Sequence, residues 1–195
     1  MTEVADEKPQ VRRPRVLLLY YSYTGQSQKV LGAAGEVFRE RGYDVTTAPI
    51  EFTDPRYAER FSRFPMRSVW PDFLGMLPAQ TLQRTGDIRT PDAVRSGDYD
   101  LICIGSPTWW STVSMPLRSF LKSHEARNLL DGKRFAVFVV CRRKWRGNLT
   151  GVRKLAEKSA KSAGEIDAIT TTLSKQSGEV KSALHSGREH LASSR

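Results

Sequence analysis

The sequence predicts an α/β fold of three layers, in which a doubly wound parallel sheet of five strands carries helices on both faces. Two observations predict it. Short apolar runs alternate along the chain with stretches of helical spacing, which is the pattern of strands joined by crossover helices. One of these runs, residues 134–141, is almost unbroken in its apolar character, as is typical of a central parallel strand. Counted along the chain, the strands are expected in the order 2-1-3-4-5.

The first strand and the first helix are expected within residues 15–38. The apolar run of residues 16–20 predicts a buried strand. Arg41 and Gly42 predict the end of the helix, since a basic last turn and a following glycine are common at helix C-termini. Apolar residues at helical spacing predict the buried face of this helix, and they are Val30, Leu31, Ala34, Val37 and Phe38.

The second strand is expected at residues 44–50 on an edge of the sheet, because Pro49 cannot donate to a central ladder. Between residues 52 and 92 the regular alternation stops, although large apolar side chains remain frequent. This segment predicts an insert with one or two short helices over an edge or mouth of the domain. Core cover, a lid and a dimer surface are the alternatives for its role.

The remaining elements follow in the same alternation. Strand three is expected at residues 101–104, and the helix after it begins near Met115, where a proline is tolerated in the first turn. Asn148 is expected to cap the helix that follows strand four. Residues 166–172 predict a more polar fifth strand on the other edge, followed by a last, weakly hydrophobic helix.

Length and composition indicate one domain over residues 15–195, preceded by a mobile arm at residues 1–14 that has no periodicity. Hydrophobic residues make up 39% of the chain, and no apolar run approaches the roughly 20 residues that span a bilayer. Since the N-terminus also lacks a signal-peptide pattern, a cytoplasmic protein is expected. Cys103 and Cys141 lie in apolar runs, so reduced thiols are expected, and no metal site is predicted.

The net charge of +10 is concentrated in one segment. Residues 142–161 contain eight basic residues and one acidic residue, Glu157, which leaves 8 − 1 = +7. Such a patch attracts anions over a Debye length, whether a phosphorylated cofactor, nucleic acid or an acidic protein.

The turn after the first strand, residues 22–27, has the chemistry of a phosphate site. The N-terminus of a helix exposes unpaired N–H groups and a partial positive charge. Gly25 lets the backbone approach an anion, and three hydroxyl groups add donors, from Ser22, Thr24 and Ser27. Simple capping of the helix by these side chains is the alternative. Neither a Walker A motif nor a G-x-G-x-x-G motif is present, which argues against a nucleoside triphosphate or a pyrophosphate.

The turn after the third strand carries two adjacent indoles, Trp109 and Trp110, on a rigid Ser-Pro-Thr segment. In the expected strand order, the turns after strands one, three and four lie together at the carboxyl ends of the strands. An indole there can stack on a flat ring or wall its edge. A ligand with a monophosphate at one end and a planar heteroaromatic ring at the other fits both turns, and flavin mononucleotide (FMN) has that shape.

Residues 22–27 resemble the FMN phosphate loop of the flavodoxin family. Residues 100–110 resemble the second FMN loop of the flavodoxin-like NAD(P)H-dependent reductases and quinone oxidoreductases. The resemblance implies that phosphate is bound by Ser22, Thr24, Gly25, Gln26 and Ser27. It implies that the ring or ribityl chain is bound by Ser106, Pro107, Thr108, Trp109 and Trp110. The third loop is placed by topology, and its candidate cofactor-binding residues are Cys141, Arg142, Arg143 and Trp145.

The function implied is that of an FMN-dependent oxidoreductase, which passes hydride or electrons from NAD(P)H to a quinone-like or other small acceptor. No catalytic side chain is needed for this, and Cys141 is interpreted as packing. Electron-carrier flavodoxins are typically acidic, whereas this third loop is basic, which would raise the flavin potential and suit NADPH.

Two alternatives belong to other classes of protein. One is a one-electron shuttle that docks on acidic partners through residues 142–161, and the other is a flavin-free module that meets nucleic acid. No helix-turn-helix or RNA-recognition signature supports the second. Members of the family often pair, so a homodimer is left open.

Overall fold

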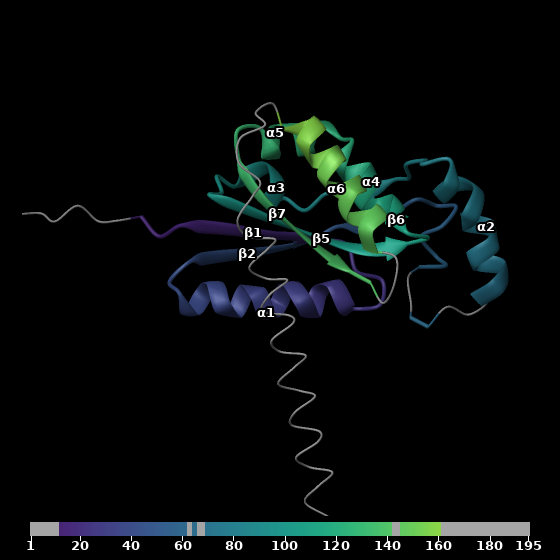
Figure 1. Cartoon of the computed structure of the whole chain (residues 1–195), viewed down its shortest axis with the longest axis horizontal. Coiled ribbons are helices and arrows are strands. Elements are labelled where there is room, and N and C mark those ends of the chain that lie inside the picture. The colour runs from purple at the N-terminus through teal and green to yellow at the C-terminus, as the bar shows by residue number, and fades with distance from the viewer. Residues whose placement is uncertain (1–11, 62–63, 66–68, 142–144, 161–195) are drawn as a thin grey trace, which may run out of the picture.

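The computed structural model describes residues 12–61, 64–65, 69–141 and 145–160. Four parallel strands form the centre of the sheet in the order β2-β1-β5-β7 (Figure 1), with the bounds Asp44–Pro49, Arg15–Tyr20, Leu101–Trp109 and Arg134–Val140. These are the predicted strands two, one, three and four. The predicted fifth strand, at 166–172, and the helix after it lie outside the described residues, so the full order remains a prediction.

The chain adds a strand that the sequence did not predict. β6 (Thr112–Val113) pairs antiparallel with the end of β5, with Trp109 opposite Thr112 and Thr108 opposite Val113. Because β6 continues the described sheet on the path β2-β1-β5-β6, the observed order departs from 2-1-3-4-5 at this point. β5 itself runs well beyond the predicted residues 101–104, since the second loop is extended backbone as far as Trp109.

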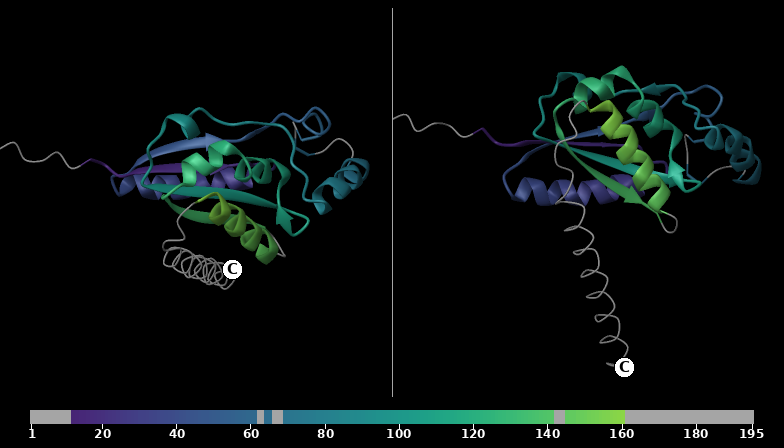
Figure 2. Two further views of the ribbon diagram at one scale, coloured as in Figure 1. Left: turned by 90° about the horizontal axis from the view of Figure 1, so that it is seen from above. Right: turned by 45° about the horizontal axis from the view of Figure 1, so that its top comes forward.

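Helices cover both faces of the sheet, as predicted. α1 (Gln26–Glu40) lies on one face, and the other face carries α3 (Ala93–Ser96), α4 (Met115–Leu121), α5 (His124–Leu130) and α6 (Trp145–Ser159), as Figures 1 and 2 show. Successive side chains of β1 point to opposite faces of the sheet, toward the helices on either side. Val16, Leu18 and Tyr20 join the core cluster on the α1 side, and Leu17, Leu19 and Tyr21 join the larger cluster with α4, α5 and α6.

The buried face of α1 differs from the prediction. Leu31 is buried, but Val30 and Val37 are 42% and 44% exposed, so their predicted inward orientation is wrong. The buried stripe instead combines Leu31 with two small residues, Ser27 and Gly35. A Cβ on Gly35 would lie 2.8 Å from Leu18 Cδ1, which shows how closely the helix approaches the sheet there. The helix is therefore rotated so that its small residues, and not most of its large apolar side chains, face the sheet.

The edge position of the second strand is confirmed within the described part of the chain, where β2 pairs with β1 alone. Pro49 lies opposite Tyr20 at the end of this ladder. A proline costs no sheet hydrogen bond on the side of an edge strand that has no neighbour.

The insert contains one long helix, α2 (Val69–Thr81), between two short strands that pair antiparallel, β3 (Glu51–Phe52) and β4 (Ile88–Arg89). In Figure 1, α2 lies beyond the end of the sheet where β5 and β6 stop. Two buried side chains attach its C-terminal end to the strands. Gln80 Nε2 donates to the carbonyl oxygens of Trp109 and Val113 at 3.2 and 2.7 Å. The Arg118 guanidinium donates to the carbonyl oxygens of Arg84 and Val113.

The start of the insert is held by Asp54, whose side chain is fully buried. Its carboxylate accepts from Arg56 Nε and Nη2 at 3.0 and 2.7 Å and from the Asp87 N–H at 3.2 Å. The side-chain hydrogen bonds from Arg56 hold the pKa of Asp54 below its ordinary value. The carboxylate therefore stabilises the fold above the unfolded pKa near 4, and this contribution is lost as pH falls through the lower folded pKa.

We expect Asp54→Asn to lower the free energy of unfolding by about 1 kcal/mol at neutral pH, a small value for charge-assisted bonds because solvent screens the exposed Arg56. Urea unfolding between pH 3 and 7 measures it, and the difference from wild type should shrink toward pH 3. Glu51→Gln is the control, because it removes an exposed pair with Arg89 and should change little. A pH-independent loss in Asp54→Asn would contradict the assignment.

Within the described residues, no helix combines the length and the apolar character needed to cross a membrane.

Candidate functional site

The loop between β1 and α1 leads into the N-terminus of α1, whose N-cap residue makes no side-chain hydrogen bond. Gly25 precedes the first helical residue, Gln26, with φ of 75°, a left-handed conformation that favours glycine. Gly25 occupies the N-cap position and gives the helix no side-chain hydrogen bond. Ser22 Oγ, however, accepts from the N–H of Gln28 in the first turn at 3.4 Å. Ser22 therefore acts in part as the helix cap that the sequence offered as the alternative. A Cβ on Gly25 would meet no heavy atom within 4 Å, so the space in front of the helix is open.

Ser27 is the unusual residue of this loop. Its side chain is 1% exposed, and its hydroxyl has no hydrogen-bond partner among the described residues. A buried hydroxyl without a partner costs about 1 to 3 kcal/mol, so most such groups in proteins are paired. The hydroxyl lies in the first turn of α1, where the backbone N–H groups also lack intrahelical acceptors. An anion at this position would supply the acceptor that both lack.

A cavity of about 590 Å³ opens beside this loop. It brings together all three predicted loops, because its lining residues are Tyr23, Thr24, Gln26, Ser27, Pro107, Thr108, Trp109, Val140 and Cys141. The carboxyl ends of β1, β5 and β7 therefore meet there, as expected for a doubly wound sheet. Tyr23 and Val140 were not among the predicted site residues.

The second loop turns back on itself at the edge of this cavity. Trp110 and Ser111 form the two-residue turn of the β5–β6 hairpin, with φ of 52° and 65°. Turns of this kind match the twist of the strands but favour glycine or asparagine, so two other residues here are under conformational strain. Trp110 lies at the tip, 37% exposed, and does not line the cavity, unlike Trp109.

Asn148 supports the second loop from α6. The sequence predicted it as a helix cap, but α6 begins at Trp145, and Asn148 is a fully buried residue inside the helix. Its Oδ1 accepts from Ser106 Oγ at 2.9 Å, and its Nδ2 donates to Thr108 Oγ1 at 2.8 Å. Ser106, a predicted cofactor ligand, is thus fully buried, bonded to Asn148, and outside the cavity lining.

Aromatic side chains surround Trp109. Its ring stacks on Phe61 of the insert, with centroids 4.7 Å apart and planes at 25°. The edge contacts are with Tyr21 at 5.7 Å and Phe52 at 6.5 Å, and Tyr23 meets Phe61 at 5.3 Å. We call these five residues the aromatic wall. One face of Trp109 is therefore covered by the insert, which the sequence did not reveal because Phe61 is 48 positions away along the chain.

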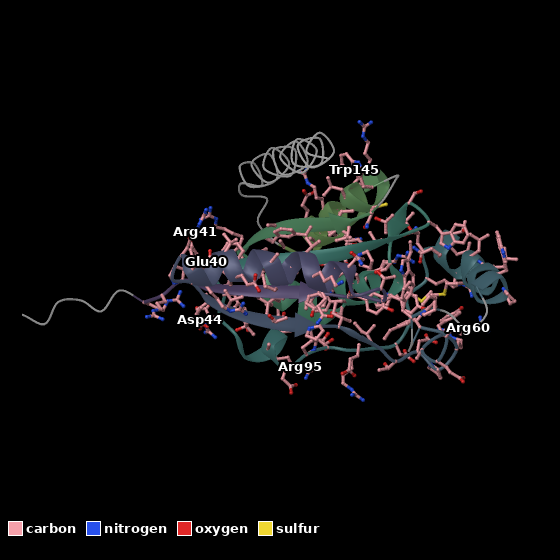
Figure 3. All side chains as sticks on the ribbon, turned by 90° about the horizontal axis from the view of Figure 1, so that it is seen from below. Glu40, Arg41, Asp44, Arg60, Arg95 and Trp145 are labelled. Atoms are coloured by element: carbon pink, nitrogen blue, oxygen red, sulfur yellow. The ribbon has the colours of Figure 1, made fainter. Side chains whose placement is uncertain are left out.

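The third loop is described in part. Cys141 is half-buried and lines the cavity, whereas Arg142 and Arg143 lie outside the described residues. Trp145 begins α6 at the surface (Figure 3), 47% exposed, with the Arg146 guanidinium carbon 5.7 Å from its ring centroid. The other cysteine, Cys103, is buried in β5, and burial raises the pKa of its thiol to about 12. It is therefore an inert core thiol, as expected.

The parallel sheet, the uncapped helix N-terminus and the cavity across three strand ends are the features of a doubly wound α/β fold. An NAD(P)H dehydrogenase (quinone) from Archaeoglobus fulgidus is 27% identical over 127 residues, which make up 64% of this chain. The chain spans about 60% of that relative's length. No family model matches the sequence.

One solved structure shows a similar fold. A flavoprotein in complex with FMN from Lactobacillus acidophilus superposes with a TM-score of 0.53 at 17% identity, covering 75% of this chain and 88% of the other. An NAD(P)H:quinone oxidoreductase from Methanothermobacter marburgensis aligns over 76% and 95% of the two chains, but its TM-score of 0.33 carries no weight. The comparisons agree with the flavodoxin-like resemblance drawn from the two loops.

Proposed function

We propose that this protein is an FMN-dependent oxidoreductase that takes electrons from NAD(P)H and delivers them to a quinone-like or other small acceptor. The observation that carries the proposal is the single cavity that joins the unpaired Ser27 hydroxyl to Trp109 and Cys141. A phosphate would find donors at one end of it and a planar ring would find apolar walls along it.

The residues of the cavity fit FMN in chemistry. Ser27, the N–H groups of the first turn of α1 and the exposed Thr24 hydroxyl would hold the phosphate. Pro107, Thr108, Trp109, Val140 and Cys141 would surround the ring system. When bound, FMN would supply hydride chemistry between a reduced nicotinamide and the acceptor, and the chain would supply binding, orientation and exclusion of water. The relatives with quinone-reductase and flavoprotein names support this reading.

The charge of α6 favours a phosphorylated electron donor. Its exposed basic residues, Arg146, Arg153, Lys154 and Lys158, belong to the helix that follows β7 at the cavity. Arg153 is partly neutralised by Glu157, at 3.7 Å. The remaining positive charge would attract the phosphates of NADPH toward this side. The same charge supports the second candidate, an electron shuttle that docks on acidic proteins.

Spectroscopy separates the two candidates. Protein loaded with FMN and freed of excess cofactor should retain the flavin absorption bands, and anaerobic NADPH or NADH should bleach them within seconds. Bound flavin that stays oxidised would favour the shuttle. Protein that retains no flavin would overturn the cofactor assignment.

The phosphate site predicts opposite effects on stability and on binding. Ser27→Ala removes a buried hydroxyl without a partner, so the flavin-free protein should be more stable by about 1 kcal/mol. The same variant should bind FMN about ten-fold more weakly, because a hydrogen bond to a charged phosphate is lost. Chemical unfolding and fluorescence titration of FMN measure the two quantities.

Ser159→Ala is the matched control. Ser159 is also a buried helical serine, but its hydroxyl donates to the carbonyl oxygen of Leu121 at 2.7 Å. It should lose about 1 kcal/mol of stability and keep its FMN affinity. Unchanged FMN affinity in Ser27→Ala would exclude this hydroxyl from the phosphate site.

A further inference from the structure

A hollow of about 510 Å³ lies at the amino ends of β1 and β2, whereas the candidate flavin cavity lies at the carboxyl ends of the strands. The last turn of α1 reaches the same end of the molecule, where Figure 3 shows Arg41 and Asp44. Its lining is mostly arginine, and the residues are Arg12, Arg13, Arg15, Arg39, Tyr43, Asp44 and Val45. None of them lines the flavin cavity. We call this site the arginine hollow.

Hydrogen bonds fix the backbone that carries three of the four arginines. The N–H of Asp44 donates to the carbonyl oxygen of Pro14 at 2.9 Å. The N–H of Arg15 donates to the Asp100 carboxylate at 2.6 Å, and the N–H of Asp100 donates to the carbonyl oxygen of Arg15 at 2.9 Å. The segment before β1 is therefore held between β2 and the start of β5. Binding groups on a fixed backbone lose less conformational entropy when a ligand binds.

Two of the four arginines have carboxylate partners. Arg12 Nη2 is 2.7 Å from Asp100 Oδ1. Arg15 Nε is 3.6 Å from Asp44 Oδ2, which is too long for a hydrogen bond. Asp44 is also the one acidic residue in the lining. The Arg15 guanidinium therefore keeps most of its donors for another acceptor.

The other two arginines, Arg13 and Arg39, are exposed and form no ion pair with any described residue. They belong to different elements, the segment before β1 and the last turn of α1, and the fold brings them to one hollow. Their like charges repel each other, and a bound anion would remove this repulsion. The last carbonyl oxygens of α1 oppose an anion only weakly, since they already accept from the N–H groups of Arg41, Gly42 and Tyr43.

The chemistry of the hollow favours linked phosphate groups. All four basic residues of the lining are arginines, whose planar guanidinium groups bind phosphate oxygens in pairs, whereas a lysine acts as a point charge. The volume is in the range of small-molecule sites. Binding along a nucleic acid instead uses basic residues spread over a face or a stripe. Two guanidinium groups without partners and two with partners match a ligand that carries several negative charges.

We propose that the arginine hollow binds an oligophosphate, a compound with two or more linked phosphate groups, either free or as the phosphate chain of a nucleotide. The ligand is held by arginine side chains and not by a glycine-rich loop. Because the hollow and the flavin cavity share no lining residue, this binding does not depend on the proposed function.

The probe is inorganic tripolyphosphate, titrated calorimetrically into the full chain with FMN present, so that the candidate phosphate site at the start of α1 is occupied. One equivalent should bind. Arg13→Gln and Arg39→Gln should each weaken binding about five- to ten-fold, as expected for lost charge-assisted hydrogen bonds at an exposed site. The double variant should lose about fifty-fold, because the two residues lie on separate elements.

Asp44→Asn reverses the sign of the effect. This change removes the carboxylate of the lining and frees Arg15, so tripolyphosphate should bind about two- to five-fold more tightly. A purely structural role of the cluster would not produce tighter binding. Arg153→Gln is the control for the basic helix α6, because Arg153 is also an exposed arginine, and it should leave binding unchanged.

ATP and tripolyphosphate, titrated in parallel, distinguish the two sources of the phosphate chain. Equal affinities indicate that the phosphates alone are bound, and tighter binding of ATP indicates a nucleotide. Three results would overturn the proposal: no binding of either compound to the wild type, equal binding by the double variant, or a loss of binding in Arg153→Gln. Binding of a short DNA duplex without binding of tripolyphosphate would also overturn it. If the chain retains no FMN, the titration without FMN still tests the hollow through Arg13 and Arg39, so the two failures are distinguishable.

Discussion

Asn148→Ala is expected to lower the free energy of unfolding by about 3 kcal/mol. The change removes two side-chain hydrogen bonds, a buried one with the Ser106 hydroxyl and a partly buried one with the Thr108 hydroxyl. It also opens a small void in a fully buried position of α6. Because Thr108 lines the candidate flavin cavity, the variant should also bind FMN several-fold more weakly.

Urea unfolding and FMN titration of the same preparation test this expectation. Asn128→Ala is the control, since Asn128 lies exposed on α5 with its Nδ2 3.1 Å from His124 Nδ1, and it should lose less than about 0.5 kcal/mol. If Asn148→Ala unfolds like this control, the bridge between α6 and the second loop does not stabilise the protein.

Gly147→Ala is expected to destabilise the protein by about 2 kcal/mol, although alanine favours a helix. A Cβ at this position would lie 2.4 Å from the backbone oxygen of Ser111, and a backbone atom cannot move aside as a flexible side chain can. Ser111 lies in the strained hairpin turn, with φ of 65°. The methyl group would therefore push the start of α6 away from the turn.

Gly32→Ala makes the same change in an open part of α1, where a Cβ would meet no heavy atom within 4 Å. It should stabilise the protein by about 0.5 to 1 kcal/mol through helix propensity alone. Differential scanning calorimetry of both variants gives the comparison. Equal gains in the two variants would show that α6 does not touch the turn as closely as described.

Local signals were enough to predict the parts of the fold that depend on neighbouring residues. Three signals depend only on residues a few positions apart. They are the apolar run at residues 16–20, Gly25 before the helix and Pro49 at the edge of the sheet. The loops at residues 22–27 and 106–110 were found in this way, and the cavity brings together Thr24, Gln26 and Ser27 of the first and Pro107, Thr108 and Trp109 of the second.

The parts that the sequence could not predict depend on contacts between distant residues. Asparagine is a common helix-capping residue, which is why the sequence predicted a cap at Asn148. Only the fold reveals that β5 supplies the hydrogen-bond partners of its side chain. In the sequence, Phe61 is one of several apolar residues of an irregular insert. Only the structure shows that its ring stacks on Trp109. The rotation of α1 likewise depends on Leu18, which fills the space beside Gly35.

Gln80 and Arg118 attach the insert to the end of the sheet, beside the candidate flavin cavity. Both side chains donate to the carbonyl oxygen of Val113, so the helix α2, its following turn and the hairpin are tied at one point. Swinging the insert outward would break the hydrogen bonds of Gln80 and the bond from Arg118 to the carbonyl oxygen of Arg84 together. The exposed rim at Thr24 and Gln26 requires no such rupture. A ligand that passed Thr24 and Gln26 would therefore need no movement of the insert.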